Sequence, residues 1–236
     1  MSRTALWKSI ASSLRTEIAE GHYRPGDKLP TEAELALRFG VNRHTVRRAL
    51  SEMAETGLVH SRRGSGVFIN AKPTEYPIGR RVRFHQNLQA AGQTPERKIL
   101  RIETRLANTR EADALALSQQ DEVHVYEGVS SADGAPLALF RSVFPAARFP
   151  LLPKALQETG SVTAALASVG VADYTRSSTR LTAKLATPTQ ALHLRIAEGA
   201  PILRTVSVNV DATLQPVEYG ITWFAGDRIS LTVSPE

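Results

Sequence analysis

The sequence predicts an α+β protein of two domains, a helical one followed by a larger one with a mostly antiparallel sheet. Apolar residues recur at helical spacing through most of the first 56 residues, whereas at least six β-prone segments alternate with short helical ones beyond residue 99. The length of 236 residues suits two domains better than one. We expect domains over residues 1–70 and 83–236, joined by a linker over 71–82 in which Pro73 and Pro77 disfavour helix.

Two helices separated by a loop begin the first domain. Apolar spacing predicts an amphipathic helix over residues 5–20, which Gly21 ends. The prolines and glycine of YRPGDKLP predict the loop. Thr31 precedes Glu34 by three residues, which is the pattern of a capping box, so we expect a short helix to begin there and to end at Gly40.

A third, basic helix follows after a short turn. Asn42 is a suitable N-cap, and an inward apolar stripe predicts a helix to about Thr56. Two helices so joined form a helix-turn-helix pattern. Arginine and threonine on the first turns of such a helix suit a DNA major groove, whereas the alternative is a solvated basic face. The outward donors are Arg43, His44, Thr45, Arg47 and Arg48.

The segment LVHSRRGSGVFIN predicts a β-hairpin with a basic tip, the form of a wing beside a helix-turn-helix. Gly64 and Gly66, on either side of Ser65, allow positive φ and a close approach of the backbone to a partner. Arg62 and Arg63 can neutralise phosphates or enter a minor groove. The rival interpretation, a loop that cradles a nucleotide phosphate, lacks the Lys-Ser/Thr pair that would follow the glycines.

The second domain is expected to alternate strands with short helices. Asp133-Gly134, between two β-prone runs, is a strong hairpin signal. The expected strands lie near residues 100–106, 122–131, 136–144, 173–186, 202–211, 216–224 and 229–233. The expected helices lie near residues 109–117, 153–159, 162–169 and 188–194, with a further short one in the segment RRVRFHQNLQAAG.

Composition excludes several classes of protein. The chain has no cysteine, which rules out disulfides, thiolate zinc sites and iron–sulfur clusters. The histidines show no metal-ligand spacing, so we expect no metal and no cofactor. Neither a signal-type segment nor a long apolar run is present, so we expect a cytoplasmic protein without a membrane partner.

Charge is distributed unevenly along the chain. Residues 1–83 hold 15 Lys/Arg and 8 Asp/Glu, a balance of +7, whereas the remaining residues carry −1. Such asymmetry indicates a module that binds a polyanion, joined to a near-neutral one.

The run LPTEAELALRFGVNRHTVRRALSEMAETGLVHSRRGSGVFI resembles the winged helix-turn-helix of the GntR family of bacterial transcription regulators almost without gaps. The resemblance implies a homodimer on a palindromic operator in double-stranded DNA. It implies DNA contacts by the recognition-helix residues Arg43, Thr45, Arg47 and Arg48, and by Gly66 in the minor groove. Glu34 matches a residue that lies near DNA in the family, although a capping box explains it equally well.

The second domain resembles the effector-binding (UTRA) domain of the HutC-type subfamily, which shares its fold with chorismate lyase. The segments RFHQNL, RSSTRLTA and PVEYG are most similar to those of phosphonate-utilisation regulators. The resemblance implies a small, often anionic metabolite in a cleft, where guanidinium and hydroxyl donors would converge on it. The candidate effector-binding residues are Arg83, Phe84, His85, Arg141, Ser177, Thr179, Glu218 and Tyr219.

Two of these candidates have alternative interpretations: Arg141 can simply pair with a carboxylate, and Glu218 can hold a hairpin or a dimer contact. The chain also departs from the subfamily. Residues 126–131 read YEGVSS where many members carry arginines, and Phe140 stands where sugar-responsive members are often acidic. These departures favour a ligand that is smaller, less charged or held differently by Arg141.

Three functions remain open at this point. The first is a dimeric transcription factor of the repressor type that responds to a metabolite. The second is a DNA-binding regulator without a small-molecule effector, and the third is a lyase-like enzyme with an accessory DNA-binding head. No nucleophile-elbow or HExxH pattern is present, so we predict no catalytic residues, and the basic first domain argues against an enzyme.

Overall fold

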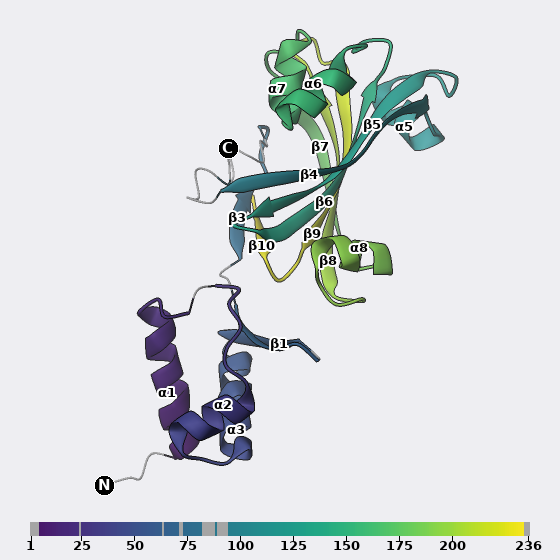
Figure 1. Cartoon of the computed structure of the whole chain (residues 1–236). Helices are drawn as coiled ribbons and strands as arrows, with labels where there is room; N and C mark the ends of the chain where they lie inside the picture. Colours follow the sequence, from purple (N-terminus) through teal and green to yellow (C-terminus); the bar gives the residue numbers. More distant parts are fainter. Residues whose placement is uncertain are drawn as a thin grey trace. The chain divides into compact units, whose positions relative to one another are not determined.

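A computed structural model describes residues 5–23, 25–62, 64–70, 73–81, 88 and 94–233, with only the backbone of Arg62. The chain divides into two compact units, Met1–Lys72 and Pro73–Glu236 (Figure 1). Residues 74–77, which the sequence assigns to the linker, form a strand of the second unit. Prolines interrupt helices but are tolerated at the ends and edges of strands, so proline content alone does not separate a linker from a short edge strand.

The first unit consists of three helices and a two-stranded hairpin, in the order that the sequence predicts. Buried apolar side chains from the helices and both strands share one core, including Leu14, Leu35, Val46, Val59 and Ile69. The strands pair antiparallel on either side of the tip. This arrangement is a winged helix-turn-helix. Its elements are α1 (Leu6–Ala19), α2 (Glu32–Phe39), α3 (Arg43–Glu55), β1 (Val59–Arg62) and β2 (Gly66–Ile69).

Both predicted caps of the helix-turn-helix are confirmed. The backbone N–H of Glu34 donates to Thr31 Oγ1 over 3.3 Å, and the Thr31 N–H donates to Glu34 Oε2 over 2.7 Å. Gly40 ends α2 in the left-handed region, at φ 64°. Asn42 Oδ1 then accepts from the N–H of Thr45 over 2.8 Å and begins α3. Each cap satisfies backbone groups that a helix end leaves unpaired, which fixes the turn between α2 and α3.

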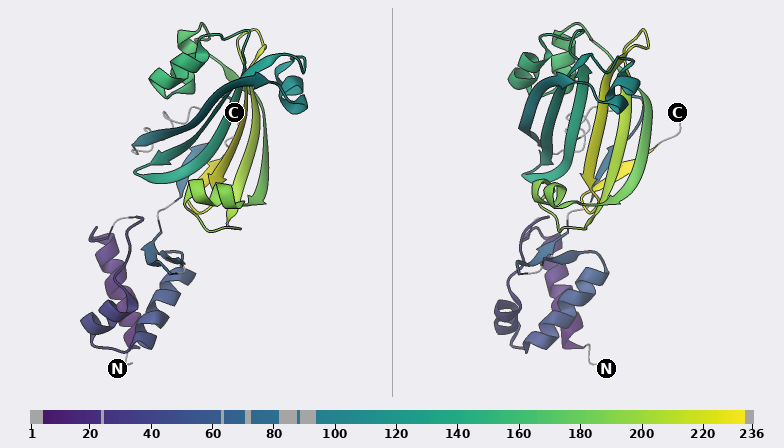
Figure 2. Two further views of the ribbon diagram at one scale, coloured as in Figure 1. Left: turned by 45° about the vertical axis from the view of Figure 1, so that its right-hand side comes forward. Right: turned by 90° about the vertical axis from the view of Figure 1, so that its right-hand side faces the viewer.

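A six-stranded antiparallel sheet forms the centre of the second unit, with the strand order β4-β5-β6-β9-β8-β7. Figure 2 shows these strands as one curved sheet. In chain order they are β4 (Pro95–Leu106), β5 (Glu122–Ala132), β6 (Ala135–Pro145), β7 (Thr175–Leu185), β8 (Pro201–Val210) and β9 (Pro216–Ala225). The short strands β3 (Thr74–Pro77) and β10 (Ile229–Thr232) pair in parallel beside the sheet. The predicted hairpin between β5 and β6 is confirmed, because Asp133 and Gly134 both have positive φ.

Helices cover both faces of the sheet. One face packs against α6 (Leu152–Thr159) and α7 (Val162–Ser168) in a core that contains Tyr126 and Phe144. The opposite face packs against α5 (Thr109–Leu115) through Val125 and Tyr219, and against α8 (Pro188–Leu194). The predicted α+β class is therefore confirmed. The helix expected in RRVRFHQNLQAAG lies largely outside the described residues.

Glu111, at the start of α5, is a buried carboxylate whose hydrogen bonds tie α5 to β4. It is 2% exposed. Its two oxygens accept from Arg105 Nη1 and Nη2 over 2.7 and 2.8 Å, and Oε2 also accepts from the Asn108 N–H. Burial raises the pKa of Glu111, but the hydrogen bonds from Arg105 and Asn108 outweigh burial and leave this pKa below its ordinary value of 4.5.

We therefore expect Glu111→Gln to lower the free energy of unfolding at neutral pH by about 2 kcal/mol, because Arg105 loses its buried charged partner and keeps only the longer ion pair with Glu103, at 3.5 Å. The wild-type stabilisation is fully present above pH 4.5 and is lost as pH falls through the lowered pKa of the folded state. Urea unfolding at pH 7 and pH 3 measures both effects. The exposed Glu198→Gln serves as the control, and an equal loss in both variants would contradict the role of the buried pair.

Candidate nucleic-acid interface and ligand cavity

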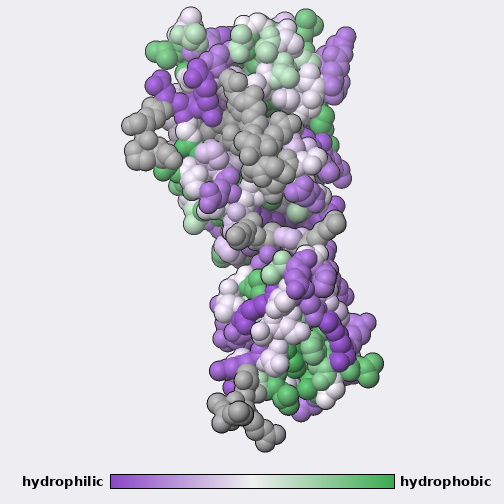
Figure 3. All heavy atoms as spheres, turned by 90° about the vertical axis from the view of Figure 1, so that its left-hand side faces the viewer, coloured by the Kyte–Doolittle hydropathy of each residue, from purple (hydrophilic) through white to green (hydrophobic). Residues whose placement is uncertain are grey.

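The donors predicted on α3 lie on one face of the helix. Arg43, His44, Arg47 and Arg48 are exposed, whereas Val46 on the opposite side is fully buried. The apolar stripe of α3, from which the sequence predicted this orientation, packs into the core of the first unit. Figure 3 shows that hydrophilic side chains cover much of this unit's surface on the face drawn, with hydrophobic ones gathered on one side.

The four basic side chains on α3 differ in the contacts that they already make. Arg47 makes a bidentate ion pair with Glu32, through Nε to Oε1 at 2.9 Å and Nη2 to Oε2 at 2.7 Å, and this pair lowers the pKa of Glu32. The Arg48 guanidinium lies 4.7 Å from the ring centroid of Trp7. Within the described part of the chain, the side chains of Arg43 and His44 have no hydrogen-bond or ion-pair partner. These two side chains are free to meet a partner without breaking an existing contact.

Thr45 and Glu34, also predicted near DNA, are occupied by helix caps. The hydroxyl of Thr45 donates to Asn42 Oδ1 over 2.9 Å. The Glu34 carboxylate accepts from both the N–H and the hydroxyl of Thr31, which lowers the pKa of Glu34. The structure thus shows a capping role for Glu34, the interpretation that the sequence offered beside a DNA contact.

Two glycines shape the tip of the wing. Gly64 and Gly66 have φ of 73° and 116°, and Ser65 between them is exposed. A Cβ at Gly66 would lie 2.6 Å from Lys28 Cε, so the side chain of Lys28 packs directly on this glycine. Sequence reasoning missed Lys28 because the contact joins residues far apart in the chain. The predicted contacts of Arg63 and of the Arg62 side chain fall outside the described residues.

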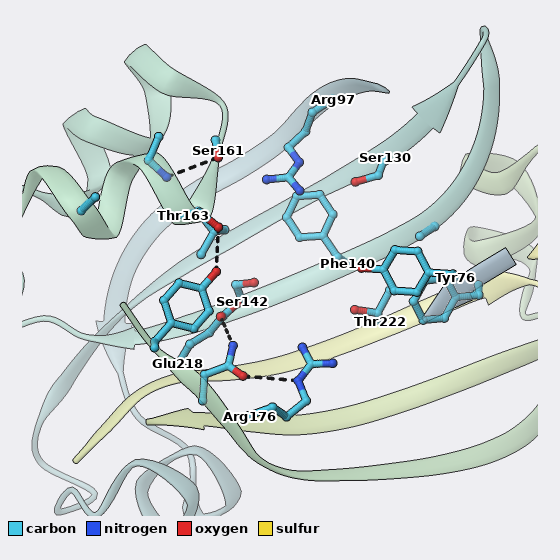
Figure 4. A pocket seen from close by; sticks show the side chains of 17 residues that line it. Tyr76, Arg97, Ser130, Phe140, Ser142, Ser161, Thr163, Arg176, Glu218 and Thr222 are labelled. Carbon is cyan, nitrogen blue, oxygen red and sulfur yellow. Dashed lines mark hydrogen bonds between the residues drawn. The ribbon is translucent and has the colours of Figure 1, made fainter. Parts of the chain in front are cut away.

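A cavity of about 320 Å³ lies in the second unit between the start of α7 and the α6/α7 face of the sheet (Figure 4). Its size suits a small metabolite. Small residues of the central strands form the floor: Ser130, Ala138, Ser142 and Thr222. Aromatic rings form much of the wall: Tyr76, Phe140, Tyr174 and Phe224. The charged and amide side chains that reach it are Arg97, Arg176, Asn209 and Glu218.

Hydrogen bonds link three of these polar side chains. Arg176 Nε donates to Asn209 Oδ1 over 3.3 Å, and Asn209 Nδ2 donates to Glu218 Oε2 over 2.6 Å. Arg97 stands apart, with Nη1 donating to the carbonyl of Gly160 over 3.0 Å. Its guanidinium lies 4.7 Å from the ring centroid of Phe140, and its Nε is buried without an acceptor among the described residues. Arg97 therefore retains donors that a bound anion can satisfy.

Of the predicted effector-binding residues that the structure describes, Glu218 alone lines this cavity. Arg141 and Tyr219 lie on the opposite face of the sheet, where Arg141 pairs with Glu127 and Tyr219 packs in the core beside α5. Successive residues of a strand point to opposite faces, so a shift of one position leads from Arg141 to Phe140 or Ser142 in the cavity.

Ser177 and Thr179 were predicted on the correct strand but do not line the cavity. The register of β7 shifts between Arg176 and Ser178, so Arg176 is the residue of this strand that lines the cavity. The segment RSSTRLTA pointed to β7, but nothing local indicated the bulge. The predicted loop contacts of Arg83, Phe84 and His85 lie outside the described residues.

No group of three or more His, Asp or Glu side chains in the described ranges is arranged to hold a metal ion. A search of the same residues finds no helix with the length and apolar content needed to span a membrane.

A winged helix-turn-helix with an exposed donor face, followed by an α+β domain with a metabolite-sized cavity, is the architecture of a bacterial transcription regulator. The chain belongs to the GntR family of bacterial regulatory proteins, and its second domain is a UTRA domain, the HutC-type combination. The model of the gntR family matches residues 6–69, and that of the UTRA domain matches residues 90–230.

Several known proteins are similar over nearly the whole chain. An HTH-type transcriptional regulator of Rhizobium meliloti is 40% identical over 230 residues, covering 97% of this chain and 94% of the relative. The probable transcriptional regulator PhnF of Escherichia coli is 34% identical, covering 96% and 94%. The crystal structure of PhnF from Mycobacterium smegmatis matches with a TM-score of 0.67 and 26% identity, covering 96% of this chain and 99% of that one.

Proposed function

We propose that the protein is a ligand-responsive repressor that binds a palindromic operator as a homodimer and changes its DNA affinity when a small anionic metabolite enters the cavity. The observation that carries the proposal is the combination, in one chain, of the exposed donor face of α3 with a cavity that contains under-satisfied arginine donors. A similar protein, NagR of Bacillus subtilis, is named a transcriptional repressor and is 26% identical over 94% of this chain. The homologues' names also favour regulation over catalysis.

In the proposed complex α3 lies in the major groove and the wing reaches the adjacent minor groove. Arg43 and His44 are the side chains best placed to read bases, since nothing in the described chain occupies them. Arg47 reaches DNA only when it leaves or shares Glu32. Backbone groups at Gly64 and Gly66 approach the phosphates, where a larger side chain would stand in the way.

A second copy of the chain supplies the second recognition helix that a palindrome requires. Half-buried apolar side chains continue across the face of β6, β9 and β8 opposite the cavity, and a partner there would cover them. They are Leu139, Val206, Val208, Ile221 and Trp223. Sedimentation of the free protein and of its complex with one or two half-sites tests this arrangement; a monomer that occupies a single half-site with full affinity would contradict it.

A thermal-shift screen tests the effector part of the proposal. Compact phosphonates, sulfonates and carboxylates are added to the full-length protein, and those that raise the melting temperature are then added to a DNA-binding titration. A stabilising compound that also changes the DNA affinity supports the proposal. No stabilisation by any compound at millimolar concentration would favour a regulator without a small-molecule effector.

Lys28→Met should reduce the salt dependence of DNA binding. The methionine keeps an apolar stem against Gly66 but removes the ammonium at the wing. If Lys28 neutralises one phosphate, the slope of log affinity against log salt falls by about 0.9, on operator and on unrelated DNA alike. Fluorescence anisotropy titrations at several salt concentrations give this slope. Lys184→Met, an exposed lysine of the second unit, is the control. An unchanged slope for Lys28→Met would show that Lys28 makes no phosphate contact.

A further inference from the structure

Two side chains of opposite formal charge face the cavity without an ion-pair partner among the described residues. Glu218 is 7% exposed and forms no ion pair with any described residue. Arg97 also forms none, and its Nε is buried without an acceptor in the described chain. A buried charge is costly unless a counter-charge or several hydrogen bonds compensate it. Among the described residues neither group has a counter-charge, so a ligand that carries both a negative and a positive group can satisfy both.

Arg176 does not neutralise Glu218 directly, because the Asn209 amide lies between them. Arg176 donates to the amide oxygen of Asn209, which orients the amide so that its nitrogen donates to Glu218 Oε2 over 2.6 Å. This contact uses only one of the two carboxylate oxygens. The other, Oε1, has no donor among the described residues. Asn209 and Arg176 thus position Glu218 and leave one of its carboxylate oxygens without a donor among the described residues.

The floor of the cavity leaves this second oxygen uncovered. Gly220 lies on the same strand face as Glu218, and a Cβ placed there would be 3.8 Å from Glu218 Oε1 and 3.2 Å from Ser207 Oγ. Ser142 pairs with Gly220 across the strands and is also small. Figure 4 shows Glu218 and Arg97 on different sides of the space above this floor. A ligand resting there would lie between the two charges.

We propose that the effector is a small zwitterion, with its acidic group bound by Arg97 and its ammonium group bound by Glu218. This inference rests on the proposed function, in which the cavity takes the effector, and it adds the ligand's positive charge. The ammonium donates to Glu218 Oε1, and the acid accepts from the free donors of the Arg97 guanidinium. A carboxylate, sulfonate or phosphonate could supply the acid, since all present oxygens to a guanidinium.

Isothermal titration calorimetry on the full-length protein tests the inference with matched pairs that differ only by the amine. The pairs are propionate and β-alanine, ethanesulfonate and taurine, and ethylphosphonate and 2-aminoethylphosphonate, with ethanolamine as the amine without an acid. For the acid that fits best, the compound with the amine should bind about tenfold or more tightly than its partner. Ethanolamine should bind more weakly than either.

Glu218→Gln should remove this preference for the amine, so that the two members of each pair bind with similar affinity. Glu127→Gln, on the opposite face of the sheet, is the control and should keep the wild-type ratio. If Glu218→Gln is unstable, the ratio of affinities within each pair, measured on the wild-type protein, still tests the inference. Equal binding within every pair overturns the zwitterion while leaving an anionic effector in place. Absence of binding by all seven compounds overturns the zwitterion and removes the support for the effector part of the proposed function.

Discussion

Arg43→Ala is expected to weaken operator binding by about 5- to 150-fold, equivalent to about 1–3 kcal/mol of lost base discrimination. Arg43 is the first residue of α3, where a recognition helix meets base edges. Its side chain is exposed and has no partner in the described chain, so the variant removes little folding energy. Binding to unrelated DNA should fall far less, because only one of several phosphate-facing cations is lost.

Competition titrations with operator and unrelated DNA at fixed salt measure this difference. Arg180→Ala, an exposed arginine of the second unit, removes the same charge and should leave both affinities unchanged. Arg47→Ala is the informative comparison, since Arg47 gives up its ion pair with Glu32 if it turns to DNA. Its loss should therefore cost less than that of Arg43. A loss by Arg43→Ala that is equal on both DNAs would show that Arg43 contacts only the backbone.

Local signals account for how well the sequence predicted the first unit. The capping box of Thr31 and Glu34, the Asn42 cap and the left-handed Gly40 each depend on residues within a few positions of one another. Such local patterns can be recognised in the sequence alone. The same holds for the Asp133-Gly134 hairpin and for the alternation of the long strands. The contact of Lys28 with Gly66 is different in kind, because no local pattern connects a loop residue with a distant wing.

The cavity was predicted less well because its location depends on which helices cover which face. Alternation along β6 separates Arg141 from Phe140 and Ser142, but it does not say which face α6 and α7 will cover. The resemblance pointed to β7 and β9, yet the register of β7 shifts between Arg176 and Ser178, and Arg176 rather than Ser177 lines the cavity. Arg97 belongs to no motif that the sequence shows. It reaches the cavity because β4 lies at the edge of the sheet, near Gly160.

One strand links the cavity to the part of the chain that leads into the first unit. β3 begins two residues after the first unit ends, and its Tyr76 lines the cavity, with a ring centroid 5.6 Å from that of Phe224. The Thr74 N–H donates to the carbonyl of Arg228 over 2.8 Å, just before β10. A ligand that contacts Tyr76 therefore acts on β3, a strand that is held by packing against Phe224 and by a backbone hydrogen bond to Arg228. A strand so held can favour one arrangement of the connection over another.

Tyr76→Ala is accordingly expected to separate ligand binding from the DNA response. In an allosteric protein the ligand changes DNA affinity by a factor that is typically about 5–150, and DNA changes ligand affinity by the same factor. In Tyr76→Ala this factor should fall toward one, because the truncated side chain no longer transmits ligand contact to β3. The ratio of ligand affinities with and without operator measures the factor independently of any change in affinity itself.

Tyr174→Phe provides the matched control for this experiment. Tyr174 also lines the cavity, and its hydroxyl bonds to Thr163 of α7, so the loss of this hydroxyl can alter ligand affinity and should leave the ratio at the wild-type value. Tyr76→Phe, which keeps the ring against Phe224, should also retain most of the coupling. The compound that binds wild type most tightly in the calorimetric series is the ligand. If Tyr76→Ala binds that compound and keeps the wild-type ratio, the coupling does not run through β3. Removal of the side chain by which β3 contacts the cavity would then have had no effect on the equilibrium that ligand and DNA both shift.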